Sequence, residues 1–89
     1  MNEAIKRAAE AVHGQAALAR AIGVQPPTVN QWLSGLRPVP AERCAAIELA
    51  TEGRVTRIDL RPEDWHRIWP ELAEKHPELV PVGGEAKAS

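Results

Sequence analysis

Apolar residues recur with helical spacing along most of the chain, and polar positions fill the opposite faces. The pattern predicts five helical segments, at about residues 3–13, 15–22, 26–33, 40–51 and 57–75. The last segment is expected as 57–61 followed by 63–75 with a kink or break at Pro70, because the residue before a proline is pushed out of the helical region. No stretch has a convincing strand pattern, so the chain is expected to be all-α.

The stretch QAALARAIGVQPPTVNQWLSG, residues 15–35, is the most informative part of the chain. Its inward positions are those of two crossing helices: Leu18, Ala19 and Ile22 in the first, and Val29, Trp32 and Leu33 in the second. Ala19 is small enough for a second helix to cross closely at a steep angle. Gly23 follows the first helix directly, and glycine adopts the positive φ of a tight turn without steric cost. The stretch therefore predicts a helix-turn-helix.

The spacing resembles that of the lambda-repressor-like and Cro-like helix-turn-helix family. The matching residues are Gln15, Leu18, Ala19, Gly23, Val29 and Trp32. The segments RPVPAERCAAIE (37–48) and VTRIDLRPEDW (55–65) look like Cro-like proteins grouped with the YdaS family of phage-type regulators, so the resemblance covers roughly residues 3–70. It implies a five-helix domain. The second helix of its helix-turn-helix, the recognition helix, is expected to enter the major groove of operator DNA.

The resemblance also implies which residues meet base edges, and these positions fall on Pro26, Pro27 and Gln31. The two prolines depart from the expected pattern, because proline has neither a hydrogen-bonding side chain nor a backbone N–H. A proline can still touch a thymine methyl group, and amide side chains suit bidentate contact with adenine. The hydrogen bonds to DNA are therefore expected from Gln25, Thr28, Asn30 and Gln31.

Two further residues are candidates for contact with the DNA backbone. Gln15 stands at a helix N-terminus, where it can bind a phosphate. Arg37, in the loop after the recognition helix, can reach a phosphate or a flanking base. For every polar residue in this set the alternative is an ordinary solvated surface side chain.

The charge balance weighs mildly against DNA binding, because the 89-residue chain has a formal net charge of −1. The distribution is uneven: residues 1–61 carry eight Lys and Arg against six Asp and Glu, and residues 62–89 carry three against six. Residues 15–37 contain Arg20 and Arg37 and no acid. A locally positive face on an acidic protein is expected, with modest non-specific affinity for DNA.

No catalytic residue, metal site or cofactor is predicted, and the chain is not expected to be an enzyme. The three histidines are scattered without the spacing of a zinc site. Cys44 is the single cysteine and is expected to be a buried, inert thiol. The chain has no nucleophile elbow, phosphate loop or dinucleotide glycine fingerprint.

Residues 1–76 are expected to form one DNA-binding domain, followed by a flexible tail at 77–89. No apolar run approaches the length of a membrane span, and residues 1–11 carry four charges that a signal peptide would lack. A cytoplasmic location without a membrane partner is therefore expected.

The apolar stripe near the end of the pattern has two interpretations. Its members are Trp65, Ile68, Trp69 and Leu72. They either complete a small core that lacks Phe and Tyr or form part of a homodimer interface, since two-fold dimers on paired half-sites are common for this motif. The favoured function is a phage or prophage Cro-type repressor. The alternatives are an antitoxin-like component that binds a toxin or other protein and regulates its own gene, and a helix-turn-helix used only for protein contacts.

Overall fold

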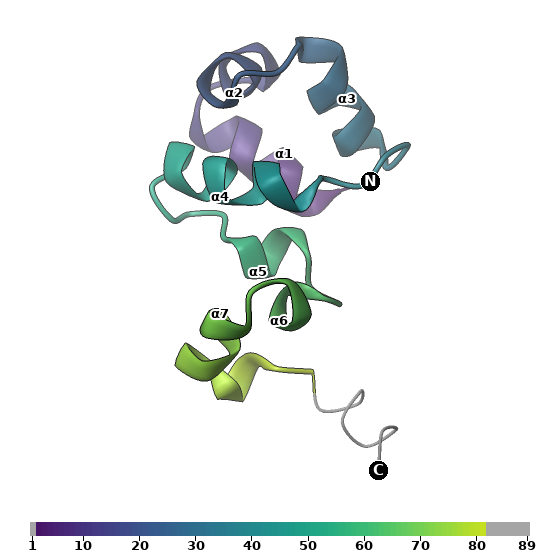
Figure 1. Cartoon of the computed structure of the whole chain (residues 1–89). Coiled ribbons are helices and arrows are strands. Elements are labelled where there is room, and N and C mark those ends of the chain that lie inside the picture. Colours follow the sequence, from purple (N-terminus) through teal and green to yellow (C-terminus); the bar gives the residue numbers. More distant parts are fainter. Residues whose placement is uncertain (1, 82–89) are drawn as a thin grey trace.

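The computed structural model describes residues 2–81, and the predicted all-α fold is confirmed (Figure 1). The helices are α1 (Glu3–Ala11), α2 (Gln15–Ile22), α3 (Pro26–Ser34), α4 (Ala41–Ala50), α5 (Arg57–Leu60), α6 (Trp65–Ile68) and α7 (Pro70–Lys75), followed by a 3₁₀ turn, η1 (Pro77–Leu79). Residues 2–81 contain no strand. Most of the predicted tail, residues 82–89, lies outside the described residues.

Helices α1 to α4 surround one apolar core, and α5 to α7 lie beneath α4 in the view of Figure 1. Helix α2 packs against α3 and α4, and α1 packs against both α2 and α3. Apart from Trp32, the core side chains are small or aliphatic: Ala4, Ile5, Ala8, Ala9, Leu18, Ala19, Ile22, Val29, Val39, Cys44, Ile47, Val55 and Leu60. Such a core is modest in volume, which makes the polar contacts between elements important for stability.

The turn between α2 and α3 has the predicted glycine conformation. Gly23 lies in the left-handed region at φ 80° and ψ 32°. Its N–H donates to the Ala19 carbonyl at 2.9 Å, and the Val24 N–H donates to the same carbonyl at 3.0 Å. Ala19 is only 1% exposed and belongs to the core, as expected for a small residue on the inward side of α2. Glycine and alanine at these two positions therefore determine how α3 leaves α2.

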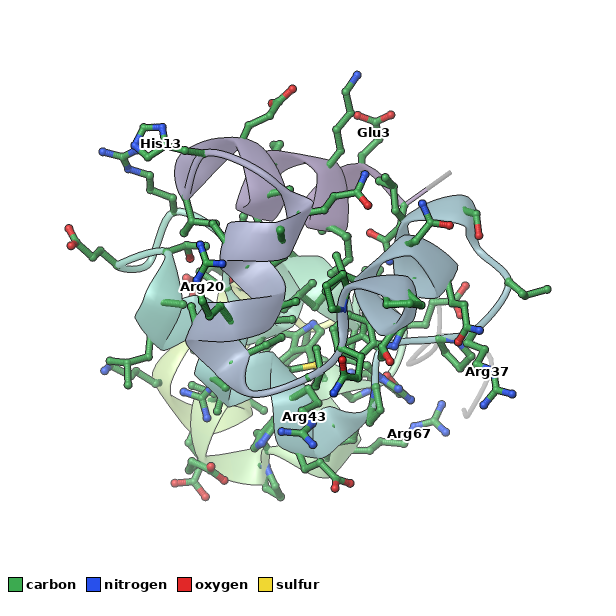
Figure 2. All side chains as sticks on the ribbon, turned by 90° about the horizontal axis from the view of Figure 1, so that it is seen from above. Glu3, His13, Arg20, Arg37, Arg43 and Arg67 are labelled. Atoms are coloured by element: carbon green, nitrogen blue, oxygen red, sulfur yellow. The ribbon has the colours of Figure 1, made fainter. Side chains whose placement is uncertain are left out.

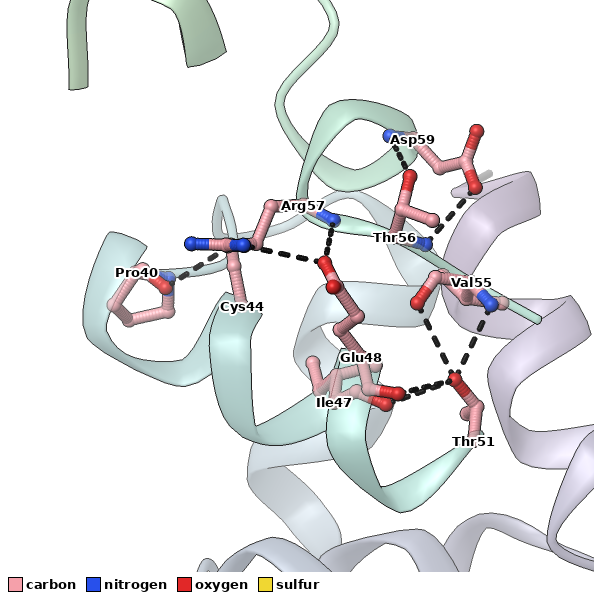
Figure 3. Close-up of polar contacts among 9 residues, drawn as sticks. All are labelled: Pro40, Cys44, Ile47, Glu48, Thr51, Val55, Thr56, Arg57 and Asp59. Atoms are coloured by element: carbon pink, nitrogen blue, oxygen red, sulfur yellow. Dashed lines mark hydrogen bonds and ion pairs between the residues drawn. The ribbon is translucent and has the colours of Figure 1, made fainter. Parts of the chain in front are cut away.

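Thr51 joins α4 to the segment that leads into α5 (Figure 3). It is 3% exposed, and its hydroxyl lies 2.9 Å from the Ile47 carbonyl, to which it can donate. The same oxygen accepts from the Val55 N–H at 3.2 Å. The buried hydroxyl is thus satisfied, and it holds the chain as it turns away from α4.

Helix α5 is short but well anchored at its first residues (Figure 3). Thr56 and Asp59 form a capping box, with hydrogen bonds of 3.0 and 3.2 Å between each side chain and the other residue's N–H. The Glu48 carboxylate accepts from the Arg57 backbone N–H at 2.9 Å and from its Nε at 3.2 Å. These bonds compensate for a helix of only four residues.

The segment predicted at 57–75 is divided into three short helices, and one predicted boundary is wrong. Helix α6 begins at Trp65, although Glu63 and Asp64 were expected to begin it. The Asp64 carboxylate accepts hydrogen bonds from Arg61 and makes no capping bond to α6. The expected interruption at Pro70 is present, because Trp69 leaves the helical region at φ −124° and ψ 78°.

The apolar stripe belongs in part to the fold. Trp65 is 1% exposed, and Trp69 packs partly buried against the core with the Arg57 guanidinium 5.4 Å from its ring centroid. Ile68 and Leu72 are half-buried. The core interpretation therefore accounts for the two tryptophans and leaves part of the two aliphatic side chains accessible. No helix within residues 2–81 is long and apolar enough to cross a membrane.

Candidate nucleic-acid interface

Helix α3 has one buried face and one face open to solvent. Val29 is fully buried and Trp32 is 3% exposed, so these two side chains fix the rotation of the helix. The residues predicted to meet DNA lie on the other face: Gln25, Pro26, Pro27 and Asn30 are exposed, and Thr28 and Gln31 are half-buried. The rotation thus presents to solvent the residues that the sequence marked as candidates.

The first three residues of α3 offer no free backbone N–H group. Gln25 is the extended N-cap, and its carbonyl accepts from the Thr28 N–H at 2.9 Å. Pro26 and Pro27 fill the first two helical positions and have no N–H to offer. These two residues can therefore donate no hydrogen bond to a ligand, which gives the neighbouring side chains a larger share of any polar contact.

Gln15 and Asn30 lie next to each other across α2 and α3. The Asn30 Nδ2 donates to the Gln15 Oε1 at 3.5 Å. This long bond leaves the Gln15 amide N–H groups and the Asn30 carbonyl oxygen available. The α2 N-cap, Gly14, makes no side-chain capping bond, so the N-terminus of α2 beside Gln15 is also uncapped. These groups form one flank of the candidate interface.

An open groove forms the other flank, between α3 and the start of α4. Four of the predicted DNA-contacting residues line it: Gln25, Thr28, Gln31 and Arg37. The backbone N–H of Arg37 donates to the Gln31 carbonyl at 3.2 Å, while its side chain is exposed. Gly35, at φ 84°, ends α3 and turns the chain toward Arg37.

Arg43 also lines this groove and was not predicted from the sequence. Its Nη1 donates to the Ile22 carbonyl in the last turn of α2 at 3.2 Å, and its other N–H groups remain available. Figure 2 shows Arg37 at the right edge of the molecule, Arg43 at the lower centre, and Arg20 and His13 at the left. The contact spans 21 residues and ends on a backbone carbonyl, so no side-chain pattern in the sequence signals it.

The charges around the groove favour an anion. Within residues 2–81, neither Arg37 nor Arg43 makes an ion pair, whereas Arg57 and Arg61 are paired with Glu48 and Asp64 at 3.2 and 2.7 Å. Glu42 is the one carboxylate among the groove residues. Two guanidinium groups against one carboxylate leave the groove with a positive balance.

Other chemistry has little support in the described part of the chain. Residues 2–81 contain no group of three or more His, Cys, Asp or Glu side chains that could hold a metal ion. Cys44 is fully buried, as expected, and burial raises the pKa of its thiol to about 11. A thiol with that pKa stays protonated near neutral pH, which agrees with a packing role.

Comparison with known proteins identifies the family. Residues 5–68 match the sequence family described as "Bacterial toxin YdaS". The chain belongs to the YdaS family. This membership confirms the YdaS resemblance of the two segments that follow the helix-turn-helix.

A curated relative is similar over most of the same region. The chain is 55% identical over 65 residues to a candidate transcriptional regulator, YdaS of Escherichia coli (strain K12). The match covers 72% of this chain and 66% of that relative, so the chain spans slightly less than two thirds of the relative's length. No solved structure matches the chain.

Proposed function

We propose that this YdaS-family chain is a sequence-specific DNA-binding regulator of transcription. The observation that supports this most is the groove beside α3, where predicted contact residues meet Arg37 and Arg43, two arginines without ion pairs in the described structure. The name of the Escherichia coli relative, a candidate transcriptional regulator, agrees with the proposal. Neither observation involves a reacting group, so the proposed activity is binding.

In the proposed complex, α3 lies in the major groove, whose width of about 12 Å admits a helix. Gln31 is the main reader of sequence, because an amide can bond adenine N6 and N7 at once. Thr28 and Gln25 supply further hydrogen bonds along the same edge. Pro26 and Pro27 provide an apolar surface for thymine methyl groups, in keeping with a first turn that lacks N–H donors.

The two flanks of α3 would hold the two sides of the DNA groove. Gln15 and Asn30 contact phosphate or sugar on one side through polar groups. Arg37 and Arg43 contact phosphates on the other, where each neutralised phosphate releases counterions. Phosphate contacts set the register in which α3 reads bases, so the flanks position the helix and Gln31 specifies sequence.

Repression follows from occupancy of a promoter, because a protein seated there excludes polymerase. We place this activity in a Cro-type regulator of a phage or prophage, acting as a homodimer on two half-sites. Half-sites one helical turn apart, about 34–36 Å, match the two-fold arrangement of this motif. The accessible parts of Ile68 and Leu72 are the candidate dimer contacts.

A second candidate function is an antitoxin-like component that binds a partner protein and regulates its own gene. The word toxin in the family description favours it, as does Leu49, an 81% exposed leucine on α4. The surroundings of the gene distinguish the two. A divergent repressor gene supports the Cro-type function, and a short gene for a toxin directly downstream supports the antitoxin.

Fluorescence anisotropy tests the proposed function. The protein is titrated into labelled DNA from upstream of its own gene and into a scrambled duplex, at two salt concentrations. Tight, salt-sensitive binding to the native sequence alone is the expected result. Equal weak binding to both duplexes, or no binding, would refute sequence-specific regulation and favour a protein partner.

A further inference from the structure

The loop between α3 and α4, residues 35–40, carries Arg37 to the edge of the groove. Arg37, Pro38 and Pro40 are all exposed, so most of this loop has little packing of its own. Val39 is the exception, because its side chain is 2% exposed and belongs to the core. The Arg37 N–H is bonded to the Gln31 carbonyl at 3.2 Å, so the position of Arg37 depends on α3 on one side and on the neighbouring Val39 on the other.

A side chain from the C-terminal part of the molecule holds the backbone at that point. Arg61 Nη1 donates to the Val39 carbonyl at 2.8 Å, across 22 residues of sequence. Residues of the same C-terminal segment, Leu60 and Pro62 among them, line a hollow with Val39. The loop thus rests against the start of the C-terminal helices through both apolar and polar contacts.

Asp64 orients the Arg61 guanidinium for this contact. Arg61 Nε donates to Asp64 Oδ1 at 3.1 Å, and Nη2 donates to Oδ2 at 2.7 Å. This two-bond fork fixes the plane of the guanidinium and leaves Nη1 free to reach the carbonyl of Val39. Lysine could not make all three bonds in this planar arrangement.

We propose that Arg61 is a positioning residue for DNA binding, which holds the Val39 carbonyl and thereby fixes Arg37 at the groove edge. This inference rests on the proposed function and extends it. The C-terminal helices contribute to DNA affinity without touching DNA, because they order the loop before binding. Without Arg61 the loop must be ordered on binding, which should weaken affinity by about 3–10-fold, or about 0.7–1.4 kcal/mol.

The test is a double-mutant cycle in DNA affinity with the variants Arg37→Gln, Arg61→Gln and the two combined. Arg61→Gln should weaken operator binding by about 3–10-fold. In the Arg37→Gln background the same change should cost less than about twofold, since Arg61 acts through Arg37. Equal losses in both backgrounds would overturn the inference.

Arg57→Gln is the matched control, because it removes an arginine paired with a carboxylate at a similar distance, Glu48 at 3.2 Å. In the described structure Arg57 makes its hydrogen bonds and its ion pair with Glu48 and none with residues 35–40, so its loss should leave operator affinity unchanged. A loss as large as that of Arg61→Gln would mean that general destabilisation, and not positioning, lowers affinity. That result would overturn the inference.

Amide hydrogen exchange in the free protein separates this inference from the proposed function. Exchange at Arg37, whose N–H donates to the Gln31 carbonyl at 3.2 Å, should accelerate by about tenfold or more in Arg61→Gln and stay unchanged in Arg57→Gln. Asp64→Asn, which keeps the side-chain shape, should give a smaller acceleration at the same amide. Failure of the wild type to bind DNA would refute the proposed function. Unchanged exchange in both Arg61→Gln and Asp64→Asn would refute the positioning role.

Discussion

Arg37 and Arg43, beside α3, and Arg57 and Arg61, in the C-terminal segment, have opposite surroundings. Arg37 and Arg43 line an open groove and make no ion pair within residues 2–81. Arg57 and Arg61 bind carboxylates, and Arg61 also holds a backbone carbonyl at 2.8 Å. One residue type therefore serves two purposes in this chain, and its contacts decide which.

This difference explains how an acidic chain can present a surface for DNA. The net charge of −1 counts every arginine equally, whether its charge is used inside the fold or remains available. The Asp64 carboxylate balances the charge of Arg61, and Glu48 of α4 balances Arg57. The unpaired arginines set the local field at the groove, and phosphate contacts respond to that local field.

The largest expected effect is on the free energy of unfolding, which should fall in Arg61→Gln and stay nearly unchanged in Arg37→Gln. Loss of Arg61 leaves the Val39 carbonyl and the Asp64 carboxylate without their donor, which should lower the free energy of unfolding by about 1–3 kcal/mol. Loss of the exposed Arg37 should change it by less than about 0.5 kcal/mol. Urea denaturation followed by circular dichroism measures both. Equal stabilities would remove the distinction between paired and unpaired arginines.

The next effect concerns sequence reading at the groove. Gln31→Ala should weaken operator binding by about 1–3 kcal/mol if the amide makes a bidentate base contact. Its effect on a scrambled duplex should be much smaller, since non-specific binding rests on phosphates. Competition binding with both duplexes measures the ratio of operator affinity to scrambled-duplex affinity for each protein. A variant that binds the operator as tightly as the wild type would exclude Gln31 from base reading.

A smaller effect appears in the pH dependence of stability. Hydrogen bonds from Arg61 hold the pKa of the Asp64 carboxyl below its usual range. The unfolded chain has the higher pKa, about 3.9, so this pair stabilises the fold above about pH 4 and stops doing so as pH falls through the folded pKa. The loss should be modest, because the Asp64 side chain is 36% exposed. In denaturation from pH 6 to pH 2.5, the stability difference between wild type and Asp64→Asn should narrow, and a constant difference would contradict the pairing.

The smallest expected effect is at Cys44, which is buried and outside both sets of arginines. Its thiol lies 3.4 Å from the Pro40 carbonyl, and its pKa is raised to about 11 by burial. At pH 8 the native thiol should react with a disulfide reagent far more slowly than in urea. Fast native labelling, measured by absorbance, would show that this part of the core opens readily.

Local patterns in the sequence were enough to predict the helix-turn-helix. Gly23 has a conformation that glycine favours, and Ala19 is a small residue buried on the inward side of α2, so each predicts local geometry by its chemistry. The exposed face of α3 followed from the spacing of Val29 and Trp32. Whether those exposed residues contact DNA stays a prediction.

The contacts that join distant segments could not be predicted in the same way. Arg43 and Arg61 each donate to a backbone carbonyl more than 20 residues away, and every residue offers the same carbonyl group. The start of α6 was mispredicted for a related reason, since the acidic residues Glu63 and Asp64 suggest a first helical turn, whereas the Asp64 carboxylate accepts from Arg61 and α6 begins at Trp65. A side chain that bonds to a residue outside its own helix is no longer available for the capping or pairing that its position in the sequence suggests.

The most direct test of the account compares the salt dependence of operator binding in two double variants of equal charge change. Arg37→Gln with Arg43→Gln removes the groove arginines, and Arg54→Gln with Lys75→Gln removes two exposed cations that are not among the groove residues. The account predicts that the slope of log K against log salt becomes shallower by about 1.8 in the first pair only, which is about 0.9 for each lost phosphate contact. Equal slopes in the two double variants would contradict the central claim that DNA is held at the groove beside α3.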